Sequence, residues 1–282
     1  MTRPSDQDIR ALIGLLEDED SYDLVRDQIL RIGEAAIPYI EERRPAADPD
    51  LAARMDAVCR ELRFDKLKHE FWRLSVSPEP DLETGALLLV KFGYPGVDTD
   101  VYKRWLDEVA AHVLRDLPPA ADEAIKFHRL NGHVFQAMGF TGNDLHYYDP
   151  ENSFINKVIE KRRGIPVSLS VLYLLLARRL GIPAHGVGTP GHFLVGFRAS
   201  DDRCYLDAYN KGRLLSAVDV QKMLARAGYE FRPEYLHPAP ARDVIIRMMR
   251  NLISIYQKMG ATERGEQLST LVEIMLSRRK EP

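Results

Sequence analysis

KRRGIPVSLSVLYLLLARRLGIPAHGVGTPGHFLVGF, residues 161–197, is the stretch of sequence that decides the fold. Pro166 suits the first turn of a helix, because the N–H group that proline lacks has no helical partner at that position. The helix that follows is apolar on nearly all sides, which predicts that it is buried. Gly181 and Pro183 end it, and the chain then extends into a strand with His192 at its start. The stretch therefore predicts a buried helix, a tight turn and a strand.

A second strand follows and brings a carboxylate toward the histidine. Residues 191–197 and 204–210 have the pattern of strands, and the polar segment 198–203 joins them as a hairpin. In such a hairpin Asp207 is a neighbour of His192 and orients its ring. An oriented histidine is half of a nucleophile–base–orienter triad. The nucleophile belongs at the N-terminus of the buried helix, where the dipole lowers the pKa of a thiol and free N–H groups hold an oxyanion.

This pattern resembles the transglutaminase-like superfamily. The core motif of that superfamily is glycine, any residue and cysteine, followed by a buried helix that ends in Arg-x-x-Gly-Ile-Pro-Ala. Residues 178–184 match that ending, and His192 and Asp207 match the histidine and aspartate of the superfamily. Gly164 matches the motif glycine, and the cysteine position falls on Pro166. The resemblance implies a scaffold that keeps the base and the carboxylate but has no nucleophilic side chain at the attacking position.

Three longer strings resemble the bacterial SirB-type family, also called regulator of SirC expression. They are residues 129–143, 147–183 and 186–197, and the resemblance extends from Asp122 to the C-terminus. It implies a transglutaminase-like core with a tetratricopeptide-like tail, in which Gly-Ile-Pro commonly replaces the cysteine motif. Eukaryotic relatives are joined to an F-box, and the family name supplies no biochemical activity.

The whole chain is predicted to be an α+β protein. Residues 1–63 form a helical, HEAT-like region. Residues 64–231 form the transglutaminase-like domain with its preceding helices, a papain-like core with a small antiparallel sheet. A proline-rich link precedes residues 243–282, which form a C-terminal helical hairpin that resembles one tetratricopeptide unit.

Two serines on the buried helix are candidates for a replacement nucleophile. Ser168 is a weak candidate, because it lies two residues past the cysteine position, about 200° round the helix. Ser170 lies a full turn on, where a small packing residue is expected. Cys204 and Asp207 point to opposite faces of their strand, so an ordinary strand cysteine is expected. Cys59 is expected in the core of the N-terminal helices.

Residues 143–154, NDLHYYDPENSF, are unusually rich in polar and aromatic side chains. One interpretation is a binding groove beside His192, lined by Tyr147, Tyr148, Asn152 and Ser153. The other interpretation is that the Asn, Asp and Pro residues build turns while the tyrosines cover the core. The sequence leaves both open.

Histidines and aspartates gather in the same part of the chain and suggest a metal site. They are His128, His133, His146, Asp144 and Asp149. Their spacing fits no ligand rule, so scattered surface histidines are expected, with no metal and no cofactor.

Charge and cysteine usage limit the partners and the compartment. The chain has 39 Lys and Arg residues against 42 Asp and Glu residues, a net charge of −3, so no basic field favours nucleic acid. Two cysteines that fit no disulfide framework favour a reducing, cytoplasmic setting. The acidic N-terminus is not a signal peptide, and the longest apolar run, residues 171–177, is too short to cross a bilayer. Neither nucleic acid nor a membrane is expected as a partner, and the oligomeric state stays open.

The leading functional hypothesis is a non-catalytic, regulatory protein that binds a peptide or protein partner in the groove beside His192. It follows from proline at the nucleophile position beside an intact histidine–aspartate pair. The alternative is a hydrolase or acyltransferase of the amidase or peptidase type, which uses His192 and Asp207 with Ser168 or an unidentified nucleophile. A regulator that touches nucleic acid follows only from the family name, and the acidic balance argues against it.

Overall fold

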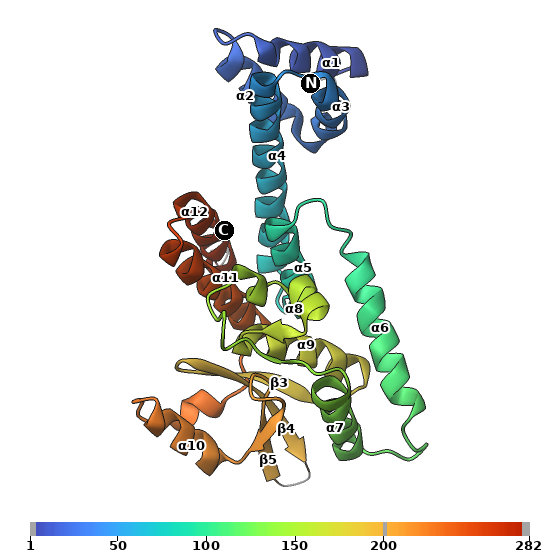
Figure 1. Ribbon diagram of the computed structural model, residues 1–282, viewed down its shortest axis with the longest axis vertical. Helices are drawn as coiled ribbons and strands as arrows, with labels where there is room; N and C mark the ends of the chain where they lie inside the picture. The colour runs from blue at the N-terminus through green and yellow to red at the C-terminus, as the bar shows by residue number, and fades with distance from the viewer. Residues whose placement is uncertain (1–3, 200–201, 278–282) are drawn as a thin grey trace. The chain divides into compact units, whose positions relative to one another are not determined.

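The computed structural model describes residues 4–199 and 202–277, and Figure 1 shows the elements along the chain. Its helices and small antiparallel sheet confirm the predicted α+β class. The chain divides into two compact units, with the division after Glu70. The helix α4 (Pro49–Ser75) runs through this division, so the boundary predicted at residues 63 and 64 lies inside a continuous helix.

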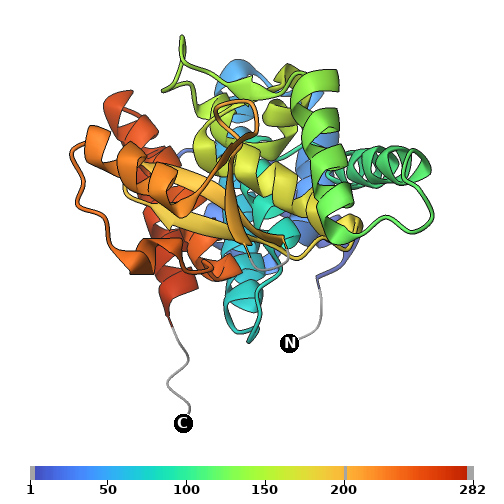
Figure 2. The same ribbon diagram turned by 90° about the horizontal axis from the view of Figure 1, so that it is seen from below.

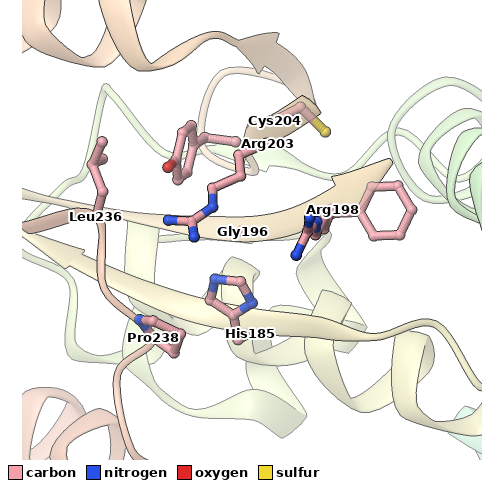
Figure 3. A pocket seen from close by; sticks show the side chains of 9 residues that line it. His185, Gly196, Arg198, Arg203, Cys204, Leu236 and Pro238 are labelled. Carbon is pink, nitrogen blue, oxygen red and sulfur yellow. The ribbon is translucent and has the colours of Figure 1, made fainter. Parts of the chain in front are cut away.

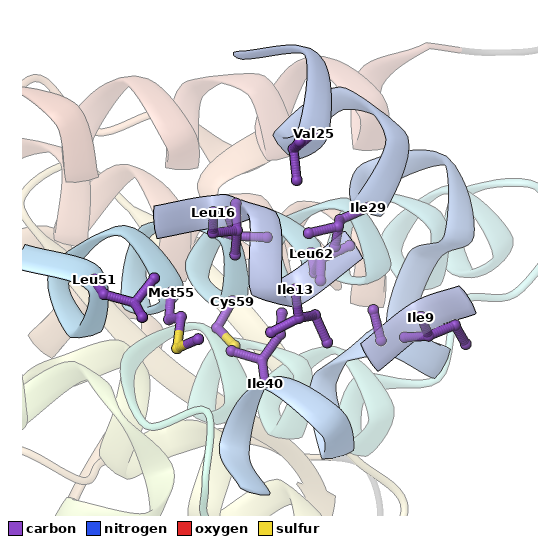
Figure 4. Close-up of a cluster of buried hydrophobic side chains, with 12 residues drawn as sticks. Ile9, Ile13, Leu16, Val25, Ile29, Ile40, Leu51, Met55, Cys59 and Leu62 are labelled. Atoms are coloured by element: carbon purple, nitrogen blue, oxygen red, sulfur yellow. The ribbon is translucent and has the colours of Figure 1, made fainter. Parts of the chain in front are cut away.

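The first unit is a set of short helices around one apolar core. It contains α1 (Asp6–Gly14), α2 (Tyr22–Ile32), α3 (Ile37–Arg43) and most of α4. Figure 4 shows the buried side chains that these helices and their connections contribute, among them Ile9, Ile13, Leu16, Val25, Ile29, Ile40, Leu51, Met55, Cys59 and Leu62. Cys59 lies in this core as predicted, and burial raises the pKa of its thiol. The likeness to a HEAT repeat stays a prediction.

In the second unit the predicted buried helix forms as α9 (Pro166–Arg179), and every residue from position 166 to 177 is buried. It is contacted by α5 (Leu82–Gly93), α6 (Asp100–Arg115), α7 (Glu123–Asn131) and α8 (Ile155–Lys161). At its end Gly181 adopts a φ of 65°, which turns the chain toward the sheet. Although α9 is apolar nearly all round, neither it nor another helix of the described ranges has the length and apolar run to traverse a bilayer.

The sheet has four antiparallel strands in the order β3–β4–β5–β6. The strands are β3 (Ala184–Thr189), β4 (His192–Ala199), β5 (Asp202–Asp207) and β6 (Arg213–Leu215). The sequence pattern predicts a strand that begins at His192, and the structure adds β3 before it, paired with β4 as a hairpin. Figures 1 and 2 show α9 on one face of the sheet and α10 (Ala217–Arg226) on the other.

Alternation along the strands decides which face each side chain occupies. Leu194 and Tyr205 point toward α10 and form an apolar core with it. Phe193 points to the opposite face, where the hydroxyl of Ser170 on α9 lies 3.4 Å from the Phe193 carbonyl oxygen. His192 opens β4 and therefore shares the face of Leu194.

A two-stranded parallel sheet, which the sequence did not predict, leads into the N-terminus of α9. Its strands are β1 (Thr141–Gly142) and β2 (Arg163–Gly164). The Gly142 N–H donates to the Tyr209 carbonyl oxygen at 2.9 Å. A Cβ atom on Gly142 would lie 2.5 Å from the Tyr209 ring, so this approach of backbone to ring requires glycine.

The chain ends in the predicted helical hairpin, which consists of α11 (Ala241–Lys258) and α12 (Thr262–Leu276). α11 packs on α5 and α9 within the second unit. The approach of α5 and α11 is so close that a Cβ atom on Gly85 would collide with Ile245. The likeness of this hairpin to a tetratricopeptide unit and the predicted domain limits stay predictions.

Candidate functional site

The structure brings His192 and Asp207 together at one end of the β4–β5 hairpin. The imidazole Nε2 lies 2.9 Å from Oδ1 of Asp207. The carboxylate also accepts hydrogen bonds from the backbone N–H and the side-chain amide of Asn210, at 3.1 and 2.7 Å. Burial alone would raise the pKa of Asp207, but the hydrogen bonds from His192 and Asn210 outweigh it and hold the pKa below its ordinary value.

This arrangement leaves the second ring nitrogen of His192 available. When the Nε2 proton is directed at the carboxylate, the neutral ring presents Nδ1 as a hydrogen-bond acceptor. The His192 side chain keeps 16% of its surface exposed, whereas Asp207 keeps 4%. Over the residues that the structure describes, no hydroxyl or thiol forms a hydrogen bond with the ring. The pair therefore has the geometry of an oriented base without an attacking group against it.

An aromatic row, made of His192, Tyr209, Tyr147 and Tyr148, extends from this pair. Tyr209 stands edge-on to the imidazole, with ring centroids 6.1 Å apart. Tyr147 stands edge-on to Tyr209 at 6.1 Å and to Tyr148 at 5.3 Å. The Nζ atom of Lys258 lies 3.5 Å from the centroid of the Tyr148 ring, a cation–π contact. The two predicted tyrosines thus connect to His192 through a third.

Sequence patterns did not single out that third tyrosine, Tyr209. Its hydroxyl donates to Oδ1 of Asp144 at 2.7 Å. Burial and then this hydrogen bond raise the pKa of Tyr209 well above its ordinary range, so the phenol stays protonated. The strand predicted over residues 204–210 ends at Asp207, and Tyr209 lies in the turn that follows it. Because strand alternation does not extend into that turn, the place of Tyr209 beside His192 follows from contacts between distant segments, such as its bond to Asp144.

The N-terminus of α9 is closed by hydrogen bonds among buried groups. Pro166 is buried at the first helical position, where it supplies neither a nucleophilic side chain nor an N–H group. Ser168 is fully buried, and its hydroxyl accepts from the Ile165 N–H at 3.1 Å. The same hydroxyl lies 2.5 Å from the carbonyl oxygen of Asn152, to which it donates its single proton. These bonds give Ser168 a structural role at this helix end.

Asn152 and Ser153 lie beneath the surface, which differs from their predicted place along a groove. The Asn152 amide donates to the His146 carbonyl oxygen at 2.6 Å and accepts from the Asn143 amide at 2.9 Å. It therefore holds the turn of residues 143–149, which carries both predicted tyrosines. Ser153 is also buried, and its hydroxyl has no hydrogen-bond partner among the described residues. For Asn152 the physical reason is that the turn needs a buried amide to satisfy its backbone carbonyls.

The other candidates lie outside this site. Cys204 faces away from Asp207, as alternation predicts, and burial raises the pKa of its thiol. His128 and His133 line one hollow near the end of α7, whereas His146 lies in the turn of residues 143–149. Within the described ranges, no three histidine, cysteine or carboxylate side chains are arranged to hold a metal ion.

Comparison with known proteins leads to one family. The family model described as transglutaminase-like superfamily matches residues 100–250. A UPF0162 protein of Xylella fastidiosa (strain 9a5c) is 35% identical over 190 residues, which cover 65% of this chain and 68% of that protein. A UPF0162 protein of Vibrio cholerae serotype O1 is 33% identical over 184 residues, 62% of this chain and 66% of that protein. F-box only protein 21 of Homo sapiens is 29% identical over 156 residues, 52% of this chain and 24% of that protein.

The comparison with solved structures found no significant match. The family model covers more than half of the chain, and it includes α9 and the hairpin that carries His192 and Asp207. This chain belongs to the transglutaminase-like superfamily, with UPF0162 proteins among its relatives.

Proposed function

We propose that this protein is a non-catalytic member of the superfamily that binds a peptide or protein partner at the aromatic row. The observation that carries the proposal is the N-terminus of α9. Pro166 occupies the position where the superfamily motif has cysteine, and the hydroxyl of Ser168 is bonded to the Asn152 carbonyl. Acyl transfer needs an attacking group, and neither residue supplies one. We therefore assign the histidine–aspartate pair a role in binding the partner.

The surface around the pair supports this role, because it exposes apolar and aromatic side chains. Leu145, in the turn that Asn152 holds, keeps 90% of its surface exposed, and Tyr148 keeps 55%. Tyr229 keeps 43% and lies beside Gly191, the residue before His192, where a Cβ atom would meet its ring at 3.3 Å. Exposed aromatic side chains of this kind contribute much of the binding energy of protein interfaces.

The aromatic row is held in place before a partner arrives. Tyr148 lies between the ring of Tyr147 and the ammonium group of Lys258, and Tyr209 is fixed by its bond to Asp144. Side chains that are already ordered lose little entropy on binding. His192 then contributes Nδ1 as an acceptor for an N–H group of the partner. A transglutaminase-like core that binds a partner without catalysing a reaction is suited to regulation, and we assign it that role.

Peptide phage display against the full chain tests the proposal. For a recovered peptide, Leu145→Ala and Tyr148→Ala are each expected to weaken binding about tenfold or more. Val101→Ala is the matched control, because Val101 is an exposed apolar residue of α6 away from the row. Binding that survives both Leu145→Ala and Tyr148→Ala, or that falls equally with Val101→Ala, contradicts the proposal.

One observation favours a second candidate, a hydrolase or acyltransferase with a nucleophile from elsewhere. Asp207 is buried and ionised beside His192, as the orienting group of a catalytic base is. Fluorophosphonate and iodoacetamide probes separate the two functions. Labelling at one site that is lost on heating and in His192→Ala supports the enzyme, whereas labelling that does not depend on His192 supports the binding protein.

A further inference from the structure

A cavity lies on the four-stranded sheet, at the opposite end of the strands from the His192–Asp207 pair. A row of three residues crosses the strands there, because the register pairs His185 with Gly196 and Gly196 with Tyr205. Because Gly196 has no side chain, the His185 ring lies against it, and the cavity that these residues line has a volume of about 160 Å³. Figure 3 shows Leu236 and Pro238 beside it, where they provide an apolar wall.

Two arginines flank this row. Arg198 and Arg203 are paired across β4 and β5, on the same face as His185. Figure 3 shows the Arg203 guanidinium and the His185 imidazole beside Gly196, whereas the Cys204 sulfur points away. Among the described residues that line the cavity, none is acidic. The cavity therefore combines cationic side chains with an apolar wall.

His185 adds a hydrogen-bonding group to this charge. Burial, and then the charge of Arg203, lowers the pKa of the imidazole. At neutral pH the ring is therefore uncharged and offers one N–H donor and one acceptor. An anion bound beside Arg203 offsets the charge of that arginine and favours the protonated ring, so it raises the pKa of His185. His185 thus reports on whether an anion occupies the cavity.

We propose that this cavity binds a small organic anion, a carboxylate or phosphate monoester whose body is no larger than one six-membered ring. Arg203 pairs with the anionic head, since a guanidinium fork matches the oxygens of both groups. His185 donates a hydrogen bond to the head, and the body packs on Leu236 and Pro238. The size limit follows from the volume, because an apolar cavity of about 150 Å³ holds one benzene ring. The site is independent of the proposed partner surface.

Gly196 sets the shape of this site. A Cβ atom at that position would collide with the His185 ring, so the imidazole lies against the sheet only because residue 196 has no side chain. Gly196→Ala is expected to displace the ring and to reduce anion binding even though Arg203 is unchanged.

Phenyl phosphate, benzoate and neutral benzyl alcohol test the proposal, each titrated into the full chain while the His185 ring is observed by ¹H–¹⁵N NMR. The two anions are expected to shift the ring signals saturably and to raise the pH at which His185 titrates, and the tighter of them identifies the head group. Benzyl alcohol has the same ring without the charge and is expected to leave the signals nearly unchanged.

Arg203→Gln is expected to weaken binding of the tighter anion at least about tenfold, because it removes a charge-assisted hydrogen bond. Arg213→Gln is the matched control, because Arg213 is an exposed arginine of β6 that does not line the cavity. The proposal is overturned if no anion shifts His185, if benzyl alcohol shifts it equally, or if Arg213→Gln weakens binding as much as Arg203→Gln.

Discussion

The hydroxyl of Ser168 lies 2.5 Å from the carbonyl oxygen of Asn152. This bond joins the first turn of α9 to the short 3₁₀ turn of residues 150–153. In the superfamily motif the start of this helix presents the attacking thiol. Here the first helical position holds Pro166, and the Ser168 hydroxyl is engaged in hydrogen bonds of the helix end, with measurable consequences.

Ser168→Ala is expected to lower the free energy of unfolding by about 0.5–1.5 kcal/mol, because the Asn152 carbonyl and the Ile165 N–H lose the serine hydroxyl and keep their mutual hydrogen bond of 3.3 Å. Urea denaturation measures the loss. Ser170→Ala is the matched control, since Ser170 is equally buried but its bond to the Phe193 carbonyl is longer, 3.4 Å. A loss no larger than that of Ser170→Ala argues against the role of the Ser168 hydroxyl.

Pro166→Cys is expected to create a thiol that iodoacetamide alkylates slowly at pH 7, because the N-terminus of a helix stabilises a thiolate but the buried position must open before the reagent reaches it. The two natural cysteines supply an internal control, since burial raises the pKa of both thiols. Mass spectrometry after timed labelling gives the rate at each position. If the superfamily geometry is retained, adding His192→Ala slows alkylation at position 166; an unchanged rate means that the imidazole does not reach that position.

Asp207→Asn is expected to be less stable than the natural protein at pH 7 and to approach it in acid. The folded pKa of Asp207 lies below its ordinary value of 3.8. Its charge therefore stabilises the fold above the unfolded pKa, and this contribution disappears as the pH falls through the folded pKa. Urea midpoints between pH 7 and pH 2 measure the convergence, which sets in below the ordinary value of 3.8. The exposed substitution Glu273→Gln in α12 is expected to show no such trend, and a difference for Asp207→Asn that stays constant with pH contradicts the assignment.

Tyr209→Phe removes the bond to Asp144 and is expected to cost about 0.5–1.5 kcal/mol. Because that bond ties the turn of residues 143–149 to the sheet, amide hydrogen exchange in the turn is expected to accelerate. Tyr102→Phe is the control, since the Tyr102 hydroxyl lies 2.6 Å from Oε1 of Glu160, outside the site. Exchange in the turn that responds equally to both variants would show that the Asp144 bond is not what holds it.

The parts of the site that the sequence predicts are those governed by local periodicity. His192 and Asp207 belong to alternating runs joined by a short polar turn, and such a turn defines both the hairpin and the parity of its side chains. The same parity places Cys204 on the other face. α9 is predicted by its largely apolar sequence between Pro166 and Gly181, with apolar residues on nearly all sides of the helix, which favours burial.

The parts that the sequence does not predict depend on contacts between distant segments. The bond from Tyr209 to Asp144 joins residues 65 positions apart, and strands of two residues such as β1 and β2 are too short to show a period. Polarity suggested that Asn152 and Ser153 face a ligand, but the turn above them needs the Asn152 amide for its own carbonyls. Whether such a polar side chain is buried depends on which backbone groups need a hydrogen-bond partner in the folded chain, and composition does not reveal this.

Gly142 has a further consequence for how variation in this chain should be interpreted. The residue has no side chain and touches no ligand, yet the ring that faces His192 rests directly on its backbone. A single added methyl group would tilt that ring and alter the proposed partner surface while every side chain on it kept its identity. Loss of binding can therefore arise at a position that an inspection of the contact residues alone would pass over.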